Sequence, residues 1–431
     1  MKMNKAIMLC AGIAFAQCSL AQSNVDKLAD EVEADVIKWR HHFHEFPELS
    51  NREFQTADYI AKYMQSLGLD VQTGVAKTGV VAILDSGKPG PVVALRADMD
   101  GLPVEERNDL AYKSEQTGEF NGKEVPVMHA CGHDTHMAML MGAATVLTEM
   151  KGELAGKVKF IFQPAEEGAP AGEKGGAEVM VKEGVLKNPD VDVIFGLHIH
   201  TNTDIGKVRY NSGGTMAAVD PFKVVINGKQ AHGAYPWKSV DPIVTAAQVV
   251  MSLQTLVSRE LKVIDDAAVV TVGSIHGGNR SNIIPEQVEM VGTIRTLNQA
   301  ARDHIYEALP RKVNAIAESM GATADVTLPL DYNYPITYND PDLTAQMVPT
   351  IERTAGKENA LVSKPVTGAE DFSFFQEKVP GLYMWVGGKP LDVPEEESPA
   401  HHTPDFYVDD KGMSLGVRLL TNLTLDYMNQ Q

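Results

Sequence analysis

Short β-type runs alternate with helical segments through the first half of the chain, and this alternation constrains the fold more than any other feature. Apolar runs begin at Val92, Val158 and Val191, each close behind a glycine or proline turn. Apolar residues with helical spacing separate them, over residues 133–150 and near 177–183. Strands that alternate with helices favour a mainly parallel sheet covered on both faces. The sequence therefore predicts an α/β fold.

The pattern changes at residues 212–214, where a Ser-Gly-Gly sequence ends the alternation. The next segments follow the order strand, helix, two strands, helix, strand, which predicts a small α+β sandwich. We therefore predict a discontinuous larger domain, residues 22–213 and 330–431, which also carries the metal-ligand candidates described below. It is interrupted by an inserted βαββαβ domain, residues 214–329.

The first 21 residues are typical of a signal peptide. Two lysines precede an apolar run, residues 6–16, that is too short to span a bilayer, and small residues lead up to Ala21. We predict cleavage after Ala21 and export to the periplasm or the medium, with lipidation of Cys18 as the alternative. The mature chain would then keep only Cys131, which cannot form an internal disulfide.

The rest of the chain carries no run long and apolar enough to be a membrane helix. The formal net charge of −19 argues against a nucleic-acid or anionic-membrane partner. The charge is most simply explained by solubility, and the composition is that of a soluble globular protein.

Polar side chains directly follow three of the predicted strands in the sequence. Each strand is followed by a pair of residues that can bind a metal ion: Asp98 and Asp100, Glu166 and Glu167, His198 and His200. In open α/β sheets, ligands bind beyond the carboxyl ends of the strands. We therefore expect these pairs to share one site.

Residues 128–136 form a loop rich in possible ligands. Cys131 and His133 can bind from one turn, because the glycine between them permits a tight bend. Thiolate and imidazole together suit zinc or another late divalent metal, and the carboxylates would also accept manganese. Asp134 and His136 would then orient the ligands.

Two more features complete the predicted site. The sequence His401-His402-Thr403-Pro404 offers a further imidazole ligand. Glu166 and Glu167 are neighbours, so in an extended segment their side chains point to opposite sides. One can bind metal while the other, beside a metal-bound water, serves as a general base.

Taken together, these motifs resemble the dinuclear metallopeptidases that include aminoacylases, hippurate hydrolases, carboxypeptidases and the hydrolases of auxin–amino acid conjugates. The resemblance runs from about residue 25 to 427 and is strongest with the amidohydrolase branch. It rests on eight ordered motifs: residues 96–103, 128–134, 163–168, 196–198, 228–236, 281–285, 368–372 and 402–404. It implies two divalent ions (Zn, Mn, Co or Ni), hydrolysis of the amide bond of N-acyl-amino acids, and a homodimer formed through the inserted lid domain.

The resemblance also implies roles for individual residues. The metal ligands would be Cys131, His133, Glu167, His198 and His402. The catalytic residues would be Glu166 as general base, Asp98, and the lid residue His232, which would stabilise the oxyanion. The substrate carboxylate would be held by Asn282 and Arg295. The residues around the ligands would be Asp100, Asp134, His136, His200 and Glu370.

Two positions depart from the family pattern, and three alternatives stay open. His200 lies in a segment where many relatives carry a proline. His401 makes the last ligand ambiguous, and we choose His402 because it directly precedes Thr403-Pro404. The alternatives are a carboxypeptidase or dipeptidase, an inactive exported binding protein on the same scaffold, and a hydrolase that uses Cys131 as nucleophile.

Overall fold

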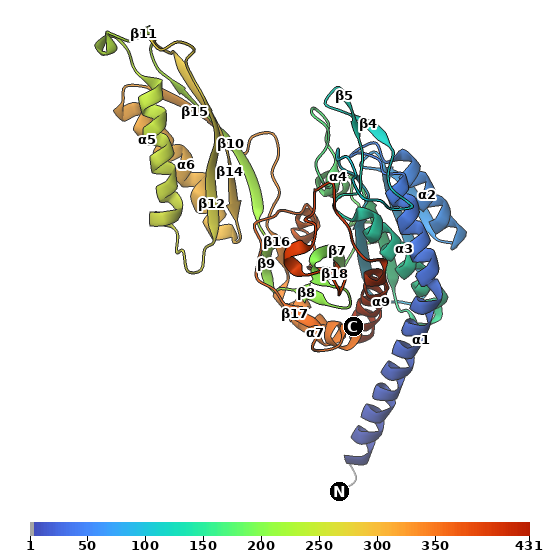
Figure 1. Cartoon of the computed structure of the whole chain (residues 1–431). Helices are drawn as coiled ribbons and strands as arrows, with labels where there is room; N and C mark the ends of the chain where they lie inside the picture. Colours follow the sequence, from blue (N-terminus) through green and yellow to red (C-terminus); the bar gives the residue numbers. More distant parts are fainter. Residues whose placement is uncertain (1–3) are drawn as a thin grey trace. The chain divides into compact units, whose positions relative to one another are not determined.

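The computed structural model describes residues 4–431, with side chains from residue 24 onward (Figure 1). The predicted signal peptide, residues 1–21, lies outside the part whose side chains are described. Among the described residues, no helix has both the length and the apolar character needed to cross a bilayer. The chain forms two compact units. The first consists of the chain up to Ser212 with Asn339–Ser363 and Phe374–Gln431, and the second of Gly213–Tyr338 with Lys364–Ser373.

The first unit is built on an eight-stranded sheet. Its strands, in spatial order, are β1 (Asp70–Val75), β2 (Gly79–Asp85), β6 (Lys157–Gln163), β3 (Val92–Asp98), β7 (Val193–Asp204), β18 (Gly381–Lys389), β8 (Val208–Tyr210) and β17 (Ala360–Val362). The central strands β6, β3, β7 and β18 run parallel. Every residue of β3 and β18 is buried, so both faces of the sheet are covered. The predicted α/β architecture is confirmed.

The helices of the first unit come from distant parts of the sequence. They are α1 (Asn4–Glu45), α2 (Phe54–Ser66), α3 (His133–Glu149), α4 (Gly176–Lys182), α7 (Pro341–Ala355), the short α8 (Ser373–Gln376) and α9 (Met413–Gln430). α1, α3 and α9 pack on one another, and α3 and α9 contact β3 and β7 (Figure 1). A surface hairpin, β4 (Thr117–Phe120) and β5 (Lys123–Pro126), precedes α3.

Strand β7 is longer than the sequence predicted. The sequence predicted that the strand ends before His198, yet it continues to Asp204, because β18 pairs with it from Ile194 to His200 and, after a register shift, again at Asp204. His198 and His200 therefore lie within the strand and not behind it. Strand β3 pairs with β7 only as far as Gly196, so the last part of β7 has a neighbouring strand on one edge only.

The second unit has the predicted βαββαβ order. It contains β10 (Ala218–Asn227), α5 (Pro242–Thr255), β12 (Ala268–His276), β14 (Gln287–Thr296), α6 (Gln299–Ser319) and β15 (Thr323–Thr327), with the antiparallel sheet in the order β12-β14-β10-β15. Phe222, Val249 and Leu309, from β10, α5 and α6, belong to its buried apolar core. Two small ladders complete it: β9 (Gly213–Met216) with β16 (Thr337–Asn339), and β11 (Ala231–His232) with β13 (Ile283–Ile284).

One segment assigned from sequence to the catalytic domain lies instead in the second unit. Residues 364–373 pair with the beginning of that unit, where the Ala217 N–H donates to the carbonyls of Val366 and Gly368, and the Val366 N–H donates to Thr215. Glu370 therefore belongs to the second unit. Backbone hydrogen bonds between segments about 150 residues apart carry no signal in a single sequence.

Candidate metal centre

The turn before α3 brings Cys131 and His133 against strand β7. Gly132 has a left-handed backbone (φ 99°), and a Cβ placed there would lie 2.3 Å from the Ile199 side chain. Only glycine permits both this backbone and this approach. The segment from the end of the chain joins the same loop, because the His402 N–H donates to Ala130 O at 2.8 Å.

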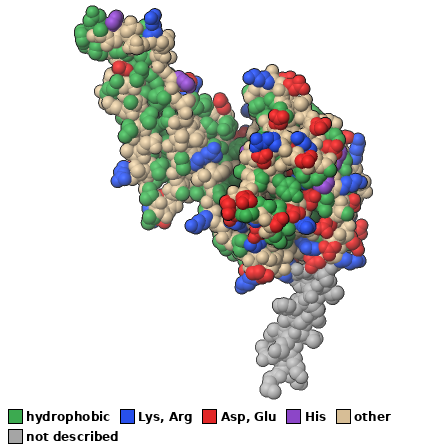
Figure 2. Space-filling model, in the orientation of Figure 1, with side chains coloured by type: hydrophobic (Ala, Val, Ile, Leu, Met, Phe, Trp, Pro, Cys, Tyr) green, Lys and Arg blue, Asp and Glu red, His purple; other side chains and the backbone are tan. Residues whose placement is uncertain are grey.

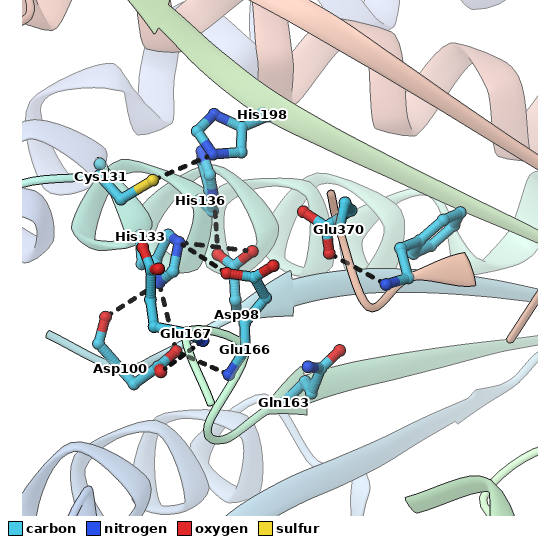
Figure 3. A network of polar contacts seen from close by, with 12 residues as sticks. Asp98, Asp100, Cys131, His133, His136, Gln163, Glu166, Glu167, His198 and Glu370 are labelled. Carbon is cyan, nitrogen blue, oxygen red and sulfur yellow. Dashed lines mark hydrogen bonds and ion pairs between the residues drawn. The ribbon is translucent and has the colours of Figure 1, made fainter. Parts of the chain in front are cut away.

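The structure brings the five predicted ligands together, all from the first unit. Figure 3 labels Cys131, His133, Glu167 and His198. Cys131 Sγ lies 3.3 Å from His198 Nε2 and 3.2 Å from His402 Nε2. His402 Nε2 lies 3.0 Å from Glu167 Oε1. Two of the groups of possible ligand atoms, each within 4.8 Å, share Cys131: one is Cys131 with His133 and His198, and the other is Cys131 with Glu167 and His402. A sulfur shared by two groups suits a pair of ions.

Asp100 holds the acidic residues in place. Its two carboxylate oxygens accept the backbone N–H groups of Glu166 (3.1 Å) and Glu167 (3.0 Å), and Ser50 donates to it at 2.7 Å. His133 donates its Nδ1–H to the Asp100 carbonyl at 2.9 Å, which leaves Nε2 as the nitrogen available to a metal. Asp100 thus positions three residues of the site.

Two residues with strained backbones flank the centre. Ala165 (φ 53°) precedes Glu166, and His402 (φ 62°) is itself a predicted ligand. Glu53 accepts the Ala165 N–H at 2.9 Å, and burial together with Asp100 raises the pKa of Glu53 to about 8. Left-handed non-glycine residues persist only where their surroundings hold them, and they are common at functional sites.

Asp98 lies at the end of β3 with both oxygens engaged. His136 donates to Oδ1 at 2.6 Å and Arg96 to Oδ2 at 2.7 Å. Although burial opposes its charge, His133, His136 and Arg96 hold the pKa of Asp98 well below its usual range. Asp98 is therefore a fixed anion beside His133, whose Nε2 lies 3.8 Å from Asp98 Oδ2.

The residues of this site fit divalent cations. His133 Nε2 is buried and has no hydrogen-bond partner among the described residues. Burial opposes the charge of His133, yet Asp98 and Asp100 raise its pKa to about 10. Burial and the carboxylates of Glu167 and Glu166 raise the pKa of the Cys131 thiol well above its usual value. Both shifts indicate a surplus of negative charge around buried His133 and Cys131, which a bound cation would neutralise.

Asp134 does not face the ligands as the sequence predicted. It accepts from Arg40 Nε at 3.0 Å and from His44 Nδ1 at 2.8 Å, so it ties the start of α3 to α1. Neither Arg40 nor His44 was among the site residues predicted from the sequence. Their signal was a charged pair, four residues apart, on the apolar stripe of α1 that includes Val36 and Phe43.

The other predicted residues are divided between the two units. His200 is half-buried in β7, where its Nδ1 lies 3.0 Å from Thr203 Oγ1. Glu370, in the second unit, is buried and accepts the Phe372 N–H at 3.0 Å. Neither belongs to the two ligand groups that share Cys131.

Within the second unit, two of the three predicted lid residues adjoin. His232 pairs with Ile283 in the β11–β13 ladder, and the Gly233 N–H donates to Asn282 O at 2.8 Å. Arg295 lies in β14 opposite Val219, eight residues beyond Gln287 at the other end of that strand. At about 3.4 Å per residue this distance is roughly 27 Å. Within one copy of the unit, Arg295 therefore lies far from the end that carries His232 and Asn282.

A donor set of sulfur, imidazole and carboxylate on an α/β unit with an α+β insertion is typical of a metal-dependent hydrolase. Residues 94–426 match the family described as Peptidase family M20/M25/M40, and the chain belongs to this family. Thermostable carboxypeptidase 2 of Saccharolobus solfataricus is 37% identical over 413 residues, 94% of this chain and 99% of the relative. The N-acyl-L-amino acid amidohydrolase of Geobacillus stearothermophilus is 39% identical over 323 residues, 75% and 83% of the two chains.

A solved structure supports the same assignment. A Bacillus subtilis protein, described as a dinuclear metal binding peptidase from the M20 family, superposes with a TM-score of 0.77 at 31% identity, covering 93% of this chain and 100% of that one. The family resemblance and the enzyme class drawn from sequence are thus confirmed: the protein is a metal-dependent hydrolase of amide or peptide bonds.

Proposed function

We propose that this hydrolase is an exported amidohydrolase that uses two divalent ions to cleave the amide bond of N-acyl-amino acids. The observation that carries the proposal is the different placement of two adjacent carboxylates. Glu167 Oε1 lies 3.0 Å from His402 Nε2, whereas Glu166 Oε2 lies 3.8 Å from His133 Nε2. Glu167 would bind an ion, and Glu166 would exchange a proton with the attacking water. The relative named for N-acyl-L-amino acids supports this substrate class, and the basic and apolar first residues support export.

The reaction follows from these positions. Two divalent ions, when bound, would polarise the amide carbonyl and lower the pKa of a water toward about 7. Glu166 takes a proton from the attacking water and delivers it to the leaving nitrogen, so water and amide give a carboxylic acid and an amine. His232 would donate a hydrogen bond to the carbonyl oxygen as negative charge develops there. Arg295 can hold the substrate carboxylate through two parallel hydrogen bonds.

The spacing of the predicted lid residues favours a dimer. Roughly 27 Å of strand separates Arg295 from the His232–Asn282 end of the same unit, as counted at about 3.4 Å per residue. This distance is longer than an N-acyl-amino acid. If both ends serve one substrate, they must come from different copies of the chain. Each active site would then combine Arg295 of one protomer with His232 and Asn282 of its partner.

The surface of the second unit suits such a partner. β12 is an edge strand, and α5 packs against it. Val244 and Met251 on α5, and Val269 and Ile275 on β12, are exposed apolar side chains. Figure 2 shows hydrophobic side chains in green over this unit. An open strand edge beside exposed apolar groups is typical of a homodimer interface.

Charges placed on this surface should separate the protomers. We expect Val244→Lys with Met251→Lys to convert a dimer into a monomer, measured by size-exclusion chromatography with light scattering. Hydrolysis should fall at least tenfold while the metal content stays the same, since all five ligands lie in the first unit. The control is Leu391→Lys, which charges an equally exposed apolar residue (70%) of the first unit. A double variant that remains dimeric would exclude α5 from the interface.

A substrate panel tests the proposed activity. Purified enzyme is stripped with a chelator, reloaded with Zn²⁺, Mn²⁺, Co²⁺ or Ni²⁺, and assayed on N-acetyl- and N-benzoyl-amino acids and on dipeptides. We expect stripping to abolish hydrolysis, reloading to restore it, and the N-acyl-amino acids to give the higher kcat/KM. Preference for dipeptides would favour the carboxypeptidase or dipeptidase alternative. Hydrolysis that survives stripping would favour Cys131 as nucleophile.

A further inference from the structure

One edge of strand β7 has no neighbouring strand beyond Gly196 among the described residues, and two histidine side chains accept its backbone hydrogen bonds there. β3 pairs with β7 only as far as Gly196, while β18 pairs with the other edge to Asp204. The Ile194 N–H points to the β18 edge, where it donates to Pro380 O. Successive residues of a strand alternate, so the N–H groups of Ile199 and Thr201 point to the edge that β3 leaves open.

On this edge, imidazole nitrogens accept the backbone N–H groups that would otherwise donate to a neighbouring strand. The Ile199 N–H donates to His136 Nε2 at 2.8 Å, and the Thr201 N–H donates to His401 Nε2 at 3.3 Å. A nitrogen that accepts a hydrogen bond carries no proton, so each ring has its proton on Nδ1. His136 Nδ1–H donates to Asp98 at 2.6 Å, and His401 Nδ1–H donates to Cys131 O at 3.1 Å.

These hydrogen bonds separate the roles of the two adjacent histidines. Both ring nitrogens of His401 are engaged with backbone, so neither is left to bind an ion. His402 Nε2 lies 3.2 Å from Cys131 Sγ and 3.0 Å from Glu167 Oε1, within a ligand group. His402 is thus the ligand, and His401 has another use.

The rings of His136 and His401 both meet the ring of His198. Their centroids lie 4.5 Å and 5.2 Å from that of His198, at interplanar angles of 69° and 73°. His198 donates its Nδ1–H to Ile199 O at 2.5 Å, which turns Nε2 toward Cys131 Sγ. Each flanking ring also comes from a segment that carries another ligand: His136 from the helix that begins at His133, and His401 from the residue before His402.

We propose that His401 is a positioning residue for the metal centre, the counterpart of His136. By holding the edge of β7 at Thr201 and the loop at Cys131, it fixes His198 and Cys131 at the spacing that binds an ion. The inference rests on the proposed dinuclear function and adds to it a residue outside the ligand set. His401 is also the better test of the two, because its shorter hydrogen bonds go to backbone and Cys131 Sγ lies 3.9 Å from its Nδ1, whereas His136 also holds the Asp98 carboxylate.

The experiment compares three substitutions of His401 in the full chain. Glutamine can place an oxygen near the position of Nε2 and accept from Thr201. Asparagine can donate to Cys131 O but does not reach Thr201. Leucine does neither. Metal-free enzyme is titrated with Co²⁺, and binding is followed by the thiolate-to-cobalt absorption band and by metal analysis.

We expect His401→Leu to bind two ions with about 10–100-fold weaker affinity, as for other residues that orient metal ligands. His401→Asn should resemble the leucine variant, and His401→Gln should recover most of the affinity. At saturating Co²⁺ the kcat of all three should lie within a few-fold of the parent enzyme. His402→Ala, in contrast, should lose at least one ion.

Other results would overturn the inference. Parent-like Co²⁺ affinity in His401→Leu, or equal affinities in the leucine and glutamine variants, would show that the Thr201 hydrogen bond does not position the centre. Loss of an ion in His401→Leu together with two ions in His402→Ala would make His401 the ligand. If the leucine variant fails to fold, the Co²⁺ affinities of the glutamine and asparagine variants are compared instead, and equal affinities would overturn the inference. Failure of the parent enzyme to bind any Co²⁺ would instead overturn the proposed function.

Discussion

Glu166→Gln is expected to keep both metal ions and to lose about 10²–10⁴-fold in kcat, the range typical of a general base. Glutamine preserves the size of the side chain but cannot accept the proton of the attacking water. The loop itself should not change, because Asp100 holds residue 166 through its backbone N–H. Steady-state kinetics on the best N-acyl-amino acid, with metal analysis of the same sample, measures both quantities, and KM should change only a few-fold.

The neighbouring residue provides the matched control. Glu167 is held by the same Asp100 carboxylate at 3.0 Å, but it belongs to a ligand group with Cys131 and His402. Glu167→Gln should therefore lose metal as well as activity, and excess metal should restore part of both. Excess metal should not restore Glu166→Gln. Turnover of Glu166→Gln within tenfold of the parent enzyme would contradict the assignment of the base.

Arg40→Met is expected to lower the free energy of unfolding by about 3–5 kcal/mol, the usual effect of removing one partner of a buried ion pair. Arg40 and Asp134 are both fully buried and 3.0 Å apart. Although burial opposes its charge, Arg40 and His44 hold the pKa of Asp134 far below its usual range. A carboxyl with a lowered folded-state pKa stabilises the protein above its unfolded pKa, near 3.9, and this contribution is lost only in strong acid. The loss in Arg40→Met should thus appear at neutral pH.

Urea unfolding of the metal-free protein, followed by circular dichroism, measures this loss. Arg52→Met is the control, because Arg52 pairs with Glu173 at 2.6 Å but the two side chains are 42% and 30% exposed. That pair should contribute only about 0–1 kcal/mol. The double variant Arg40→Met with Asp134→Asn should lose less free energy of unfolding than the sum of the losses in the two single variants. Equal losses in the Arg40 and Arg52 variants would show that the buried pair does not stabilise the link between α1 and α3.

The sequence predicted the architecture well because its signals are local. Turn residues, apolar runs and helical spacing mark each element, and parallel strands bring their carboxyl ends to one edge. The five predicted ligands meet for this reason, although His198 proved to lie inside β7. The length of β7 was set by its pairing with β18, which begins 177 residues after Asp204. The sequence of either segment alone does not indicate which distant segment it pairs with.

The supporting residues were harder to predict for the same reason. Arg40 contacts Asp134, 94 residues away, and lies on a helix whose pattern indicates only an amphipathic surface. The separation of Arg295 from His232 needs the register of β10 on β14, which the order of elements does not give. The roles of His401 and His402 needed the hydrogen bonds of each ring, because the two residues are identical in type and adjacent.

The distance along the chain between Cys131 and His402 has a consequence for biosynthesis. These residues are 271 positions apart, and the whole second unit is translated between them. A nascent chain that has emerged up to His198 carries four of the five ligands but cannot close the group that needs His402. Closing so long a loop is slow and entropically unfavourable, and an ion with ligands from both segments would stabilise the closed loop. Metal loading would therefore act as a late checkpoint in maturation, passed only by chains in which both segments of the catalytic unit have joined.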